Sequence, residues 1–146
     1  MLSQTAEYAL RAIVFLADNH GEARTTDDIA GVTKVPVGYL AKIMQSLAKA
    51  GVVVSQRGLH GGFTLLRSPT DLTIYDVVQA IDPIVRITTC PLNLPNHATS
   101  LCPLHRRLDN AMAAIETAFR KTSIKQLLSD PNPSKPLCAF PRNQPD

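Results

Sequence analysis

The chain has 146 residues, enough to bury one hydrophobic core without disulfides or a structural metal. Its hydrophobic content of 45% and charged content of 18% are typical of a globular domain and argue against a disordered chain. No apolar run approaches the roughly 20 residues that span a bilayer, and the N-terminus lacks a basic segment followed by an apolar one. We therefore expect a soluble, cytoplasmic protein with no membrane partner.

Charge is distributed unevenly along the chain, although the net charge is only +3. No Asp or Glu occurs from Ile29 to Thr70. The cations of this acid-free block are Lys34, Lys42, Lys49, Arg57 and Arg67. A basic block within an otherwise balanced domain predicts a surface that binds phosphates.

Three helices are expected in the first third of the chain. Apolar residues at helical spacing predict a helix over residues 3–18, which Asn19-His20-Gly21 ends. Thr26, followed by two acids, predicts the cap of a second short helix that ends near residues 31–34. Pro36 suits the first position of a third helix, which Gly51 ends. The spacing of the second and third helices, with a short turn between them, is typical of a helix-turn-helix.

A β-hairpin and a fourth helix follow. Residues 52–56 and 62–66 read as strands, and the glycines of the intervening residues 57–61 permit a tight turn. Thr73 predicts the cap of a helix over residues 74–81. The expected fold is mainly α with a small β-hairpin, and residues 1–83 form a winged helix-turn-helix domain that binds DNA.

The second half is expected to hold a cysteine-containing sensor loop over residues 84–102, then a long helix and a short C-terminal helix over 103–129. Residues 130–146 contain many prolines and predict a disordered tail. The long helix carries apolar residues at alternating steps of four and three, which is typical of a two-helix contact. They are Leu104, Leu108, Ala111, Ile115 and Ala118. Either they form a homodimer interface, which we favour because two-fold symmetric readers match palindromic DNA, or they pack on their own domain.

The candidate DNA-binding residues lie on the third helix, before it, and on the hairpin. Basic side chains can neutralise phosphates, and a glutamine can read an adenine edge. The candidates are Lys34, Lys42 and Arg67 for phosphates, Tyr39 for a phosphate through its hydroxyl, Gln45 for adenine, Ala41 for a thymine methyl, Gly38 for close approach, and Arg57, Gly58 and His60 at the hairpin tip, with Arg57 in the minor groove. In the alternative, Tyr39 packs in the protein, and Lys42, Gln45 and His60 are ordinary surface residues.

The cysteines suggest a second site. Cys90 and Cys102 are each followed by Pro-Leu, and Cys102 stands where the long helix begins, which favours its thiolate. His97 lies between them and His105 one turn beyond Cys102, so both could add nitrogen ligands for an iron–sulfur cluster or zinc. The alternative is two buried cysteines and two surface histidines. Cys138, in the tail, is interpreted as a bystander or a thiol recruited late, and not as a ligand.

Three segments together resemble the Rrf2 family of bacterial transcription regulators: residues 2–12 (LSQTAEYALRA), the helix at Tyr39-Leu40, and residues 57–63 (RGLHGGF). The likeness covers about residues 1–128. It implies a homodimer that binds double-stranded DNA and crosses its long helices at the dimer interface. The family includes regulators of iron–sulfur assembly, nitric-oxide response and cysteine metabolism.

The resemblance also bears on the cofactor. Cluster-binding members hold iron through three cysteines in this loop, and Cys90 and Cys102 match the outer two, whereas Asn96 and His97 stand where the middle one would be. Some members add a ligand from the partner subunit's first helix, where Glu7 lies. A [2Fe–2S] cluster on two thiolates with His97, His105 or Glu7 is therefore favoured over [4Fe–4S]; zinc, or no metal and a thiol switch, are the alternatives.

The sequence thus predicts a regulator and not an enzyme. It contains no Ser/His/Asp set, phosphate loop or paired carboxylates, and we expect no small-molecule substrate. The rival interpretations are an electron carrier, a metal-dependent enzyme or a protein-interaction module on a winged-helix scaffold. Such proteins would not need the acid-free basic block.

Overall fold

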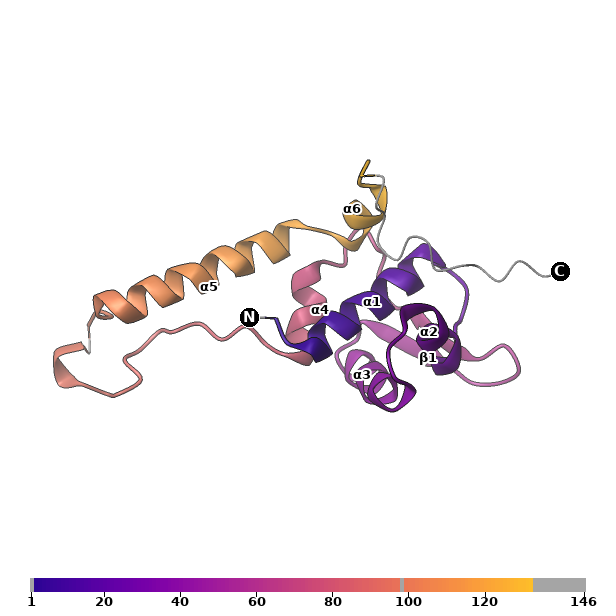
Figure 1. Ribbon diagram of the computed structural model, residues 1–146, viewed down its shortest axis with the longest axis horizontal. Helices are drawn as coiled ribbons and strands as arrows, with labels where there is room; N and C mark the ends of the chain where they lie inside the picture. The colour runs from indigo at the N-terminus through magenta and orange to yellow at the C-terminus, as the bar shows by residue number, and fades with distance from the viewer. Residues whose placement is uncertain (1, 98, 133–146) are drawn as a thin grey trace.

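The computed structural model describes residues 2–97 and 99–132. The predicted tail falls largely on residues 133–146, which lie outside the described residues, as does Cys138. The elements are, in chain order, α1 (Gln4–Asp18), α2 (Thr26–Thr33), α3 (Val37–Lys49), β1 (Val53–Gln56), β2 (Gly62–Leu65), α4 (Ile74–Ile81), the 3-10 helix η1 (Pro95–His97), α5 (Pro103–Lys121) and α6 (Ile124–Ser129). Figure 1 shows a body formed by α1–α4, α6 and the hairpin, from which α5 and the preceding loop project as an arm. The predicted fold class is confirmed.

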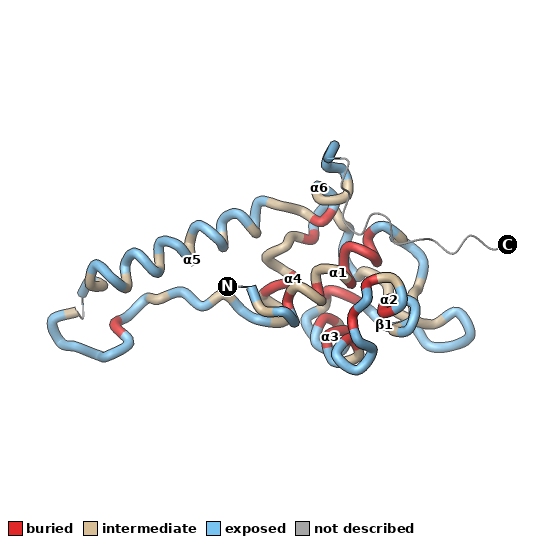
Figure 2. Tube along the Cα trace, in the orientation of Figure 1, coloured by how far each residue is buried: buried red, intermediate tan, exposed pale blue. Residues whose placement is uncertain are grey.

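The core of the body is built around α1. Residues 12–17 of this helix are all buried. Ala9, about one turn earlier, and Ala6, about two turns earlier, are also fully buried. Helix α1 packs against α2, α3, α4, α6 and β2. From α3 the core receives four side chains at helical spacing: Leu40, Ile43, Met44 and Leu47. Figure 2 shows that burial is concentrated in this body.

Two helix starts differ from the prediction. Helix α2 is capped by Thr25, not Thr26: the Thr25 hydroxyl accepts from the Asp28 amide at 3.1 Å, and the Asp28 carboxylate accepts from the Thr25 amide at 3.1 Å. This capping box needs an acid three residues after the hydroxyl, which Thr25 has and Thr26 lacks. Pro36 is the N-cap of α3 rather than its first residue, because its ψ of 133° is extended while its carbonyl accepts from Leu40.

The hairpin is held to the body by a contact that the sequence did not reveal. Strands β1 and β2 pair antiparallel, with Gln56 opposite Gly62. Beyond this pair, Arg24 and Phe63 exchange two backbone hydrogen bonds of 3.0 and 2.7 Å, so the segment before α2 acts as a third strand of one residue. The approach is so close that a Cβ on Gly62 would lie 2.5 Å from the carbonyl carbon of Arg24. Gly62 also has a φ of +141°, which other residues rarely adopt.

The arm leaves the body after α4 and returns beside the beginning of α4. The amide of Ile74 donates to the Thr122 carbonyl at 3.0 Å, and the amide of Ile124 donates to the Leu72 carbonyl at 2.8 Å. Ile124 is fully buried in the body. Both ends of the arm are therefore fixed to α4. No helix in the described part of the chain is long and apolar enough to cross a membrane.

The Gly62 contact gives a first prediction. Gly62→Ala should lower the free energy of unfolding by about 2 kcal/mol, because the methyl group meets the Arg24 backbone and the positive φ is strained. Urea unfolding at a fixed protein concentration measures this. Gly31→Ala is the matched control: a Cβ there meets open space within a helix, so stability should stay the same or rise by up to about 1 kcal/mol. Equal stability of the two variants would contradict the tight Gly62 contact.

Candidate nucleic-acid interface and cysteine loop

The turn before α3 sets the exposed face of that helix. Three residues join α2 to α3, and the first, Lys34, is left-handed with a φ of 58° and directs its N–H to the Ala30 carbonyl at 2.9 Å. Val35, next in the turn, is buried and fixes the turn to the core. Arg11 of α1 donates to the Thr33 carbonyl at 3.2 Å and so holds the last residue of α2. This is helix-turn-helix geometry, with α3 as the second helix.

The predicted reading face of α3 is open to solvent. Gly38, Lys42 and Gln45 are exposed, and Ala41 is half-buried beside them. Tyr39 has 63% of its surface exposed, so it does not pack in the core of the protomer. The surface thus combines small, cationic and amide side chains on one helix, which is the chemistry that base edges and phosphates require.

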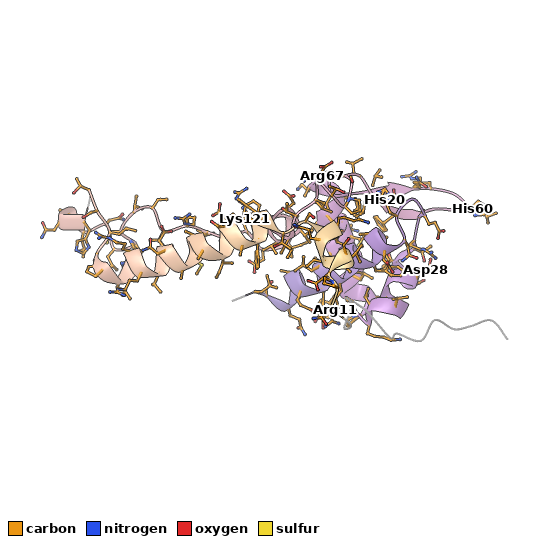
Figure 3. The ribbon with its side chains drawn as sticks, turned by 90° about the horizontal axis from the view of Figure 1, so that it is seen from above. Arg11, His20, Asp28, His60, Arg67 and Lys121 are labelled. Carbon is orange, nitrogen blue, oxygen red and sulfur yellow. The ribbon has the colours of Figure 1, made fainter. Side chains whose placement is uncertain are left out.

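The hairpin tip carries the next group of candidates. Arg57, Gly58 and His60 are all exposed, and Gly58 has a φ of +108°. Figure 3 shows His60 at the outer end of the hairpin, well away from Arg67. The tip is therefore open to solvent on the hairpin that corresponds to the wing of a winged helix.

Arg67 differs from the other candidates, because its guanidinium already has partners within the protein. It lies 3.2 Å from the Asp76 carboxylate and donates to the Asp71 carbonyl at 2.7 Å. Burial raises the pKa of Asp76, but hydrogen bonds from Thr73 and the charge of Arg67 outweigh it and hold that pKa below its usual value. A phosphate would have to compete with this ion pair for Arg67.

The cysteine loop forms two separate sulfur–nitrogen pairs. The Cys90 sulfur lies 3.6 Å from Nδ1 of His97, and the Cys102 sulfur lies 3.2 Å from Nδ1 of His105. Cys90 is buried, and Cys102 is the N-cap of α5 as predicted. The backbone amide of Leu94, and after it the His97 ring, hold the pKa of the Cys90 thiol below its usual value. Cys90 is buried, as the alternative interpretation expects, but each of the two cysteines has a histidine ring beside its sulfur.

Each pair has the spacing of two ligands on one metal. A sulfur at about 2.3 Å and a nitrogen at about 2.0 Å from a tetrahedral ion lie about 3.5 Å apart. The pairs are not joined into one site, however: within residues 2–97 and 99–132 no three His, Cys, Asp or Glu side chains form a group that could hold a metal ion. Glu7, the candidate from α1, bonds Arg11 at 2.8 Å in the same helix.

The sequence did not reveal how the loop is fixed to α5. Arg86 makes a two-pronged ion pair with Asp109 of α5, with distances of 2.6 and 2.7 Å, and the Ile87 amide donates to the same carboxylate at 2.9 Å. The hydrogen bond from Arg86 holds the pKa of Asp109 below its usual value. The only sequence signal for this pair was its opposite charges, 23 residues apart.

Comparison with known protein families and sequences identifies the family of this chain. The Rrf2 family model, described as an iron-dependent transcriptional regulator, matches residues 2–130. The chain belongs to the Rrf2 family. A putative HTH-type transcriptional regulator of Aquifex aeolicus is 33% identical over 132 residues, which cover 88% of this chain and 92% of the relative. A putative rrf2-like HTH-type regulator of Rhodobacter capsulatus is 38% identical over 94 residues, 62% of this chain and 63% of that protein.

Solved Rrf2-type structures share the fold. CymR, the global cysteine regulator of B. subtilis, superposes with a TM-score of 0.73 at 24% identity and covers 88% of this chain and 96% of its own. IscR of T. potens has a TM-score of 0.75 at 22% identity, with 90% of this chain and 88% of its own covered. The predicted family and winged-helix fold are thus confirmed, and the family is one of DNA-binding transcriptional regulators and not of enzymes.

Proposed function

We propose that this Rrf2 regulator is a sequence-specific homodimer whose loop 84–102 senses redox state, nitric oxide or iron and adjusts its hold on double-stranded DNA. The observation that carries the DNA-binding part is that the face of α3 and the hairpin tip are both exposed and both lie within a block free of acids. Lys34, Lys42 and Arg57 would neutralise phosphates or enter the minor groove, and Gln45 would read a base edge.

Homodimerisation is supported by the surface of α5. No residue of this helix is buried in the protomer. The three large apolar side chains of the seam are exposed, with 62% of the surface of Leu104, 45% of Leu108 and 40% of Ile115 accessible to solvent. Ala111 and Ala118 of the same seam are exposed as well. The alternative that the seam packs on its own domain has no support from this burial, and a second copy of α5 would cover it.

Sensing is supported by the pairing of each cysteine with a histidine. If the two pairs came together on one metal centre, the two thiolates with His97 and His105 would make a mixed sulfur and nitrogen donor set, which suits [2Fe–2S] or zinc better than a [4Fe–4S] cluster. Such a group, when bound, supplies a centre that oxygen, nitric oxide or iron shortage can alter. The family description as an iron-dependent regulator supports the iron version. A metal-free thiol switch is the second candidate, favoured by the lowered pKa of Cys90.

The loop can act on the DNA-binding body through a chain of polar contacts. The Ile84 amide donates to Oε1 of Gln79 in α4 at 2.6 Å, and Nε2 of Gln79 donates to the Tyr75 hydroxyl at 2.8 Å. The Arg120 guanidinium lies 3.5 Å above the Tyr75 ring. Helix α4 packs against α3. A shift of the loop would therefore change the setting of α4 and, in a dimer, the spacing of the two α3 helices.

The DNA-binding proposal predicts distinct effects for two residues of α3. Lys42→Ala should weaken binding to all duplexes alike and reduce the slope of log affinity against log salt by about 1. Gln45→Ala should relax the preference at one base pair by about 1–3 kcal/mol. Fluorescence anisotropy on selected duplexes at several salt concentrations measures both. Lys121→Ala, on α5 (Figure 3), is the control and should leave affinity and slope unchanged. Salt-insensitive binding would refute DNA recognition by this surface.

The dimer proposal predicts that a charge on the seam separates the subunits. Leu108→Glu should convert a species of two 15.8 kDa chains into single chains, because a carboxylate would be buried without a partner. Sedimentation velocity gives the mass, and circular dichroism should show that the protomer keeps its helices, since Leu108 is open in it. Thr117→Glu, on the opposite side of α5, should remain dimeric. Loss of the dimer in both variants, or in neither, would argue against this seam.

The sensor proposal predicts iron or zinc in protein prepared without oxygen. Cys90→Ser and Cys102→Ser should each remove most of the bound metal and, for a cluster, the sulfide and the visible absorbance, because each takes away a thiolate ligand. His97→Ala and His105→Ala should lower metal content less. Cys138→Ser is the control and should keep the wild-type content. Metal-free wild-type protein whose DNA affinity changes on mild oxidation would favour the thiol switch instead.

A further inference from the structure

The tip of the hairpin presents an apolar side chain to solvent. Leu59 has 96% of its surface exposed, more than any other large hydrophobic side chain in the described residues. Single exposed leucines are common on protein surfaces and need no explanation by themselves. Leu59 is different because a backbone hydrogen bond closes the turn that carries it, and because Arg57 and His60 lie close to it in the chain.

The turn that carries Leu59 is tightly built. The Gly61 amide donates to the Gly58 carbonyl at 3.0 Å, which leaves Leu59 and His60 as the two central residues of the turn. A Cβ on Gly61 would lie 2.6 Å from the Gln56 carbonyl oxygen. The next residue, Gly62, is clamped against Arg24. The turn therefore presents Leu59 at the outer end of the hairpin, beside the His60 side chain that Figure 3 places there.

The charge around Leu59 selects a polyanion as its partner. Arg57 precedes it by two residues, and the hairpin lies wholly within the acid-free block of residues 29–70. The hairpin follows directly on α3 in the chain, and α3 packs against β1. In the winged-helix mode of binding, a duplex held in its major groove by α3 would meet the hairpin tip at the neighbouring minor groove. An apolar side chain beside an arginine is the combination that proteins use in the minor groove.

We propose that Leu59 enters the minor groove beside each half-site and discriminates against G·C pairs there; this rests on the proposed DNA-binding function. The two kinds of base pair present similar acceptors in that groove, but G·C adds the guanine 2-amino group. Leucine has no acceptor for this group, so the amino group of a guanine beneath Leu59 could no longer donate to water and would find no other acceptor. A·T pairs carry no such group and accept the apolar contact.

Arg57 also favours A·T pairs in the minor groove, but for another reason, and the effects of the two side chains can be separated. The arginine responds to the negative potential of a narrow groove, which depends on groove shape and is weakened by salt. The leucine responds to one amino group, whatever the salt. Duplexes that differ by this group alone therefore report on Leu59.

The experiment measures the affinity of the full-length wild-type protein for duplexes with one altered pair, moved in turn through each flanking position. The four pairs are A·T, G·C, inosine·C, which lacks the amino group, and 2,6-diaminopurine·T, which has it. At one position per half-site, A·T and inosine·C should bind at least about fivefold tighter than G·C and diaminopurine·T. Leu59→Ala should reduce this ratio to below about twofold, with the salt slope and the thermal stability unchanged.

Arg57→Ala is the matched variant on the same hairpin. It should weaken binding to all four duplexes and reduce the salt slope, yet keep the discrimination against the amino group. The proposal is overturned if the wild-type protein binds its site specifically but treats the four pairs alike at every flanking position. It is also overturned if Leu59→Ala keeps the wild-type ratio. Absence of any salt-sensitive duplex binding would instead refute the proposed function itself.

Discussion

The packing of α1 determines where every functional element of the body lies. Ala6, Ala9 and Ala12 are fully buried and small, so the neighbouring helices can approach the axis of α1 closely. The larger Ile13 and Leu16 of the same helix belong to the buried core, and α1 packs against α2, α3 and α4. Because the inner face of α3 is used in this core, its outer face is left to solvent with the polar residues that the sequence puts there. The exposed polar face of α3 is thus a consequence of core packing.

Much of this arrangement could be predicted from the sequence because it depends on local rules. The apolar spacing in α3, the Thr73 cap of α4 and the Cys102-Pro103 start of α5 all act within one or two turns of a helix. The cap of α2 was misplaced by one residue because Thr25 and Thr26 are both good caps, and only the Asp28 carboxylate distinguishes them. Pro36 was also misplaced by one position, since it is the N-cap of α3, so local rules place these helix starts to within one residue.

The contacts that join distant segments could not be predicted. The Arg24–Phe63 bridge uses backbone groups only, so no side-chain pattern marks it, and the glycine that permits it was read merely as part of a strand. The bond between Arg86 and Asp109 joins residues on either side of the cysteine loop. Arg67 was predicted to bind phosphate because its charge is visible in the sequence, whereas its pairing with Asp76 is not. The charges in a sequence predict whether a surface is basic or acidic, but not which basic side chains are left without an ion pair and can bind a phosphate.

The arm brings two incomplete features into one segment. Its helix exposes an apolar seam. Its loop holds two cysteine–histidine pairs, which do not form a single group of metal ligands within the described residues. Both features are costly or inactive in an isolated chain, since exposed apolar surface favours association and a pair of ligands binds metal weakly. Covering the seam with a second chain would fix α5, and through the Arg86–Asp109 pair it would also fix the base of the loop. Dimer formation and the ordering of the sensor loop would then be one thermodynamic process, and a change at the cysteines would reach α3 through α4 without any contact between the loop and DNA.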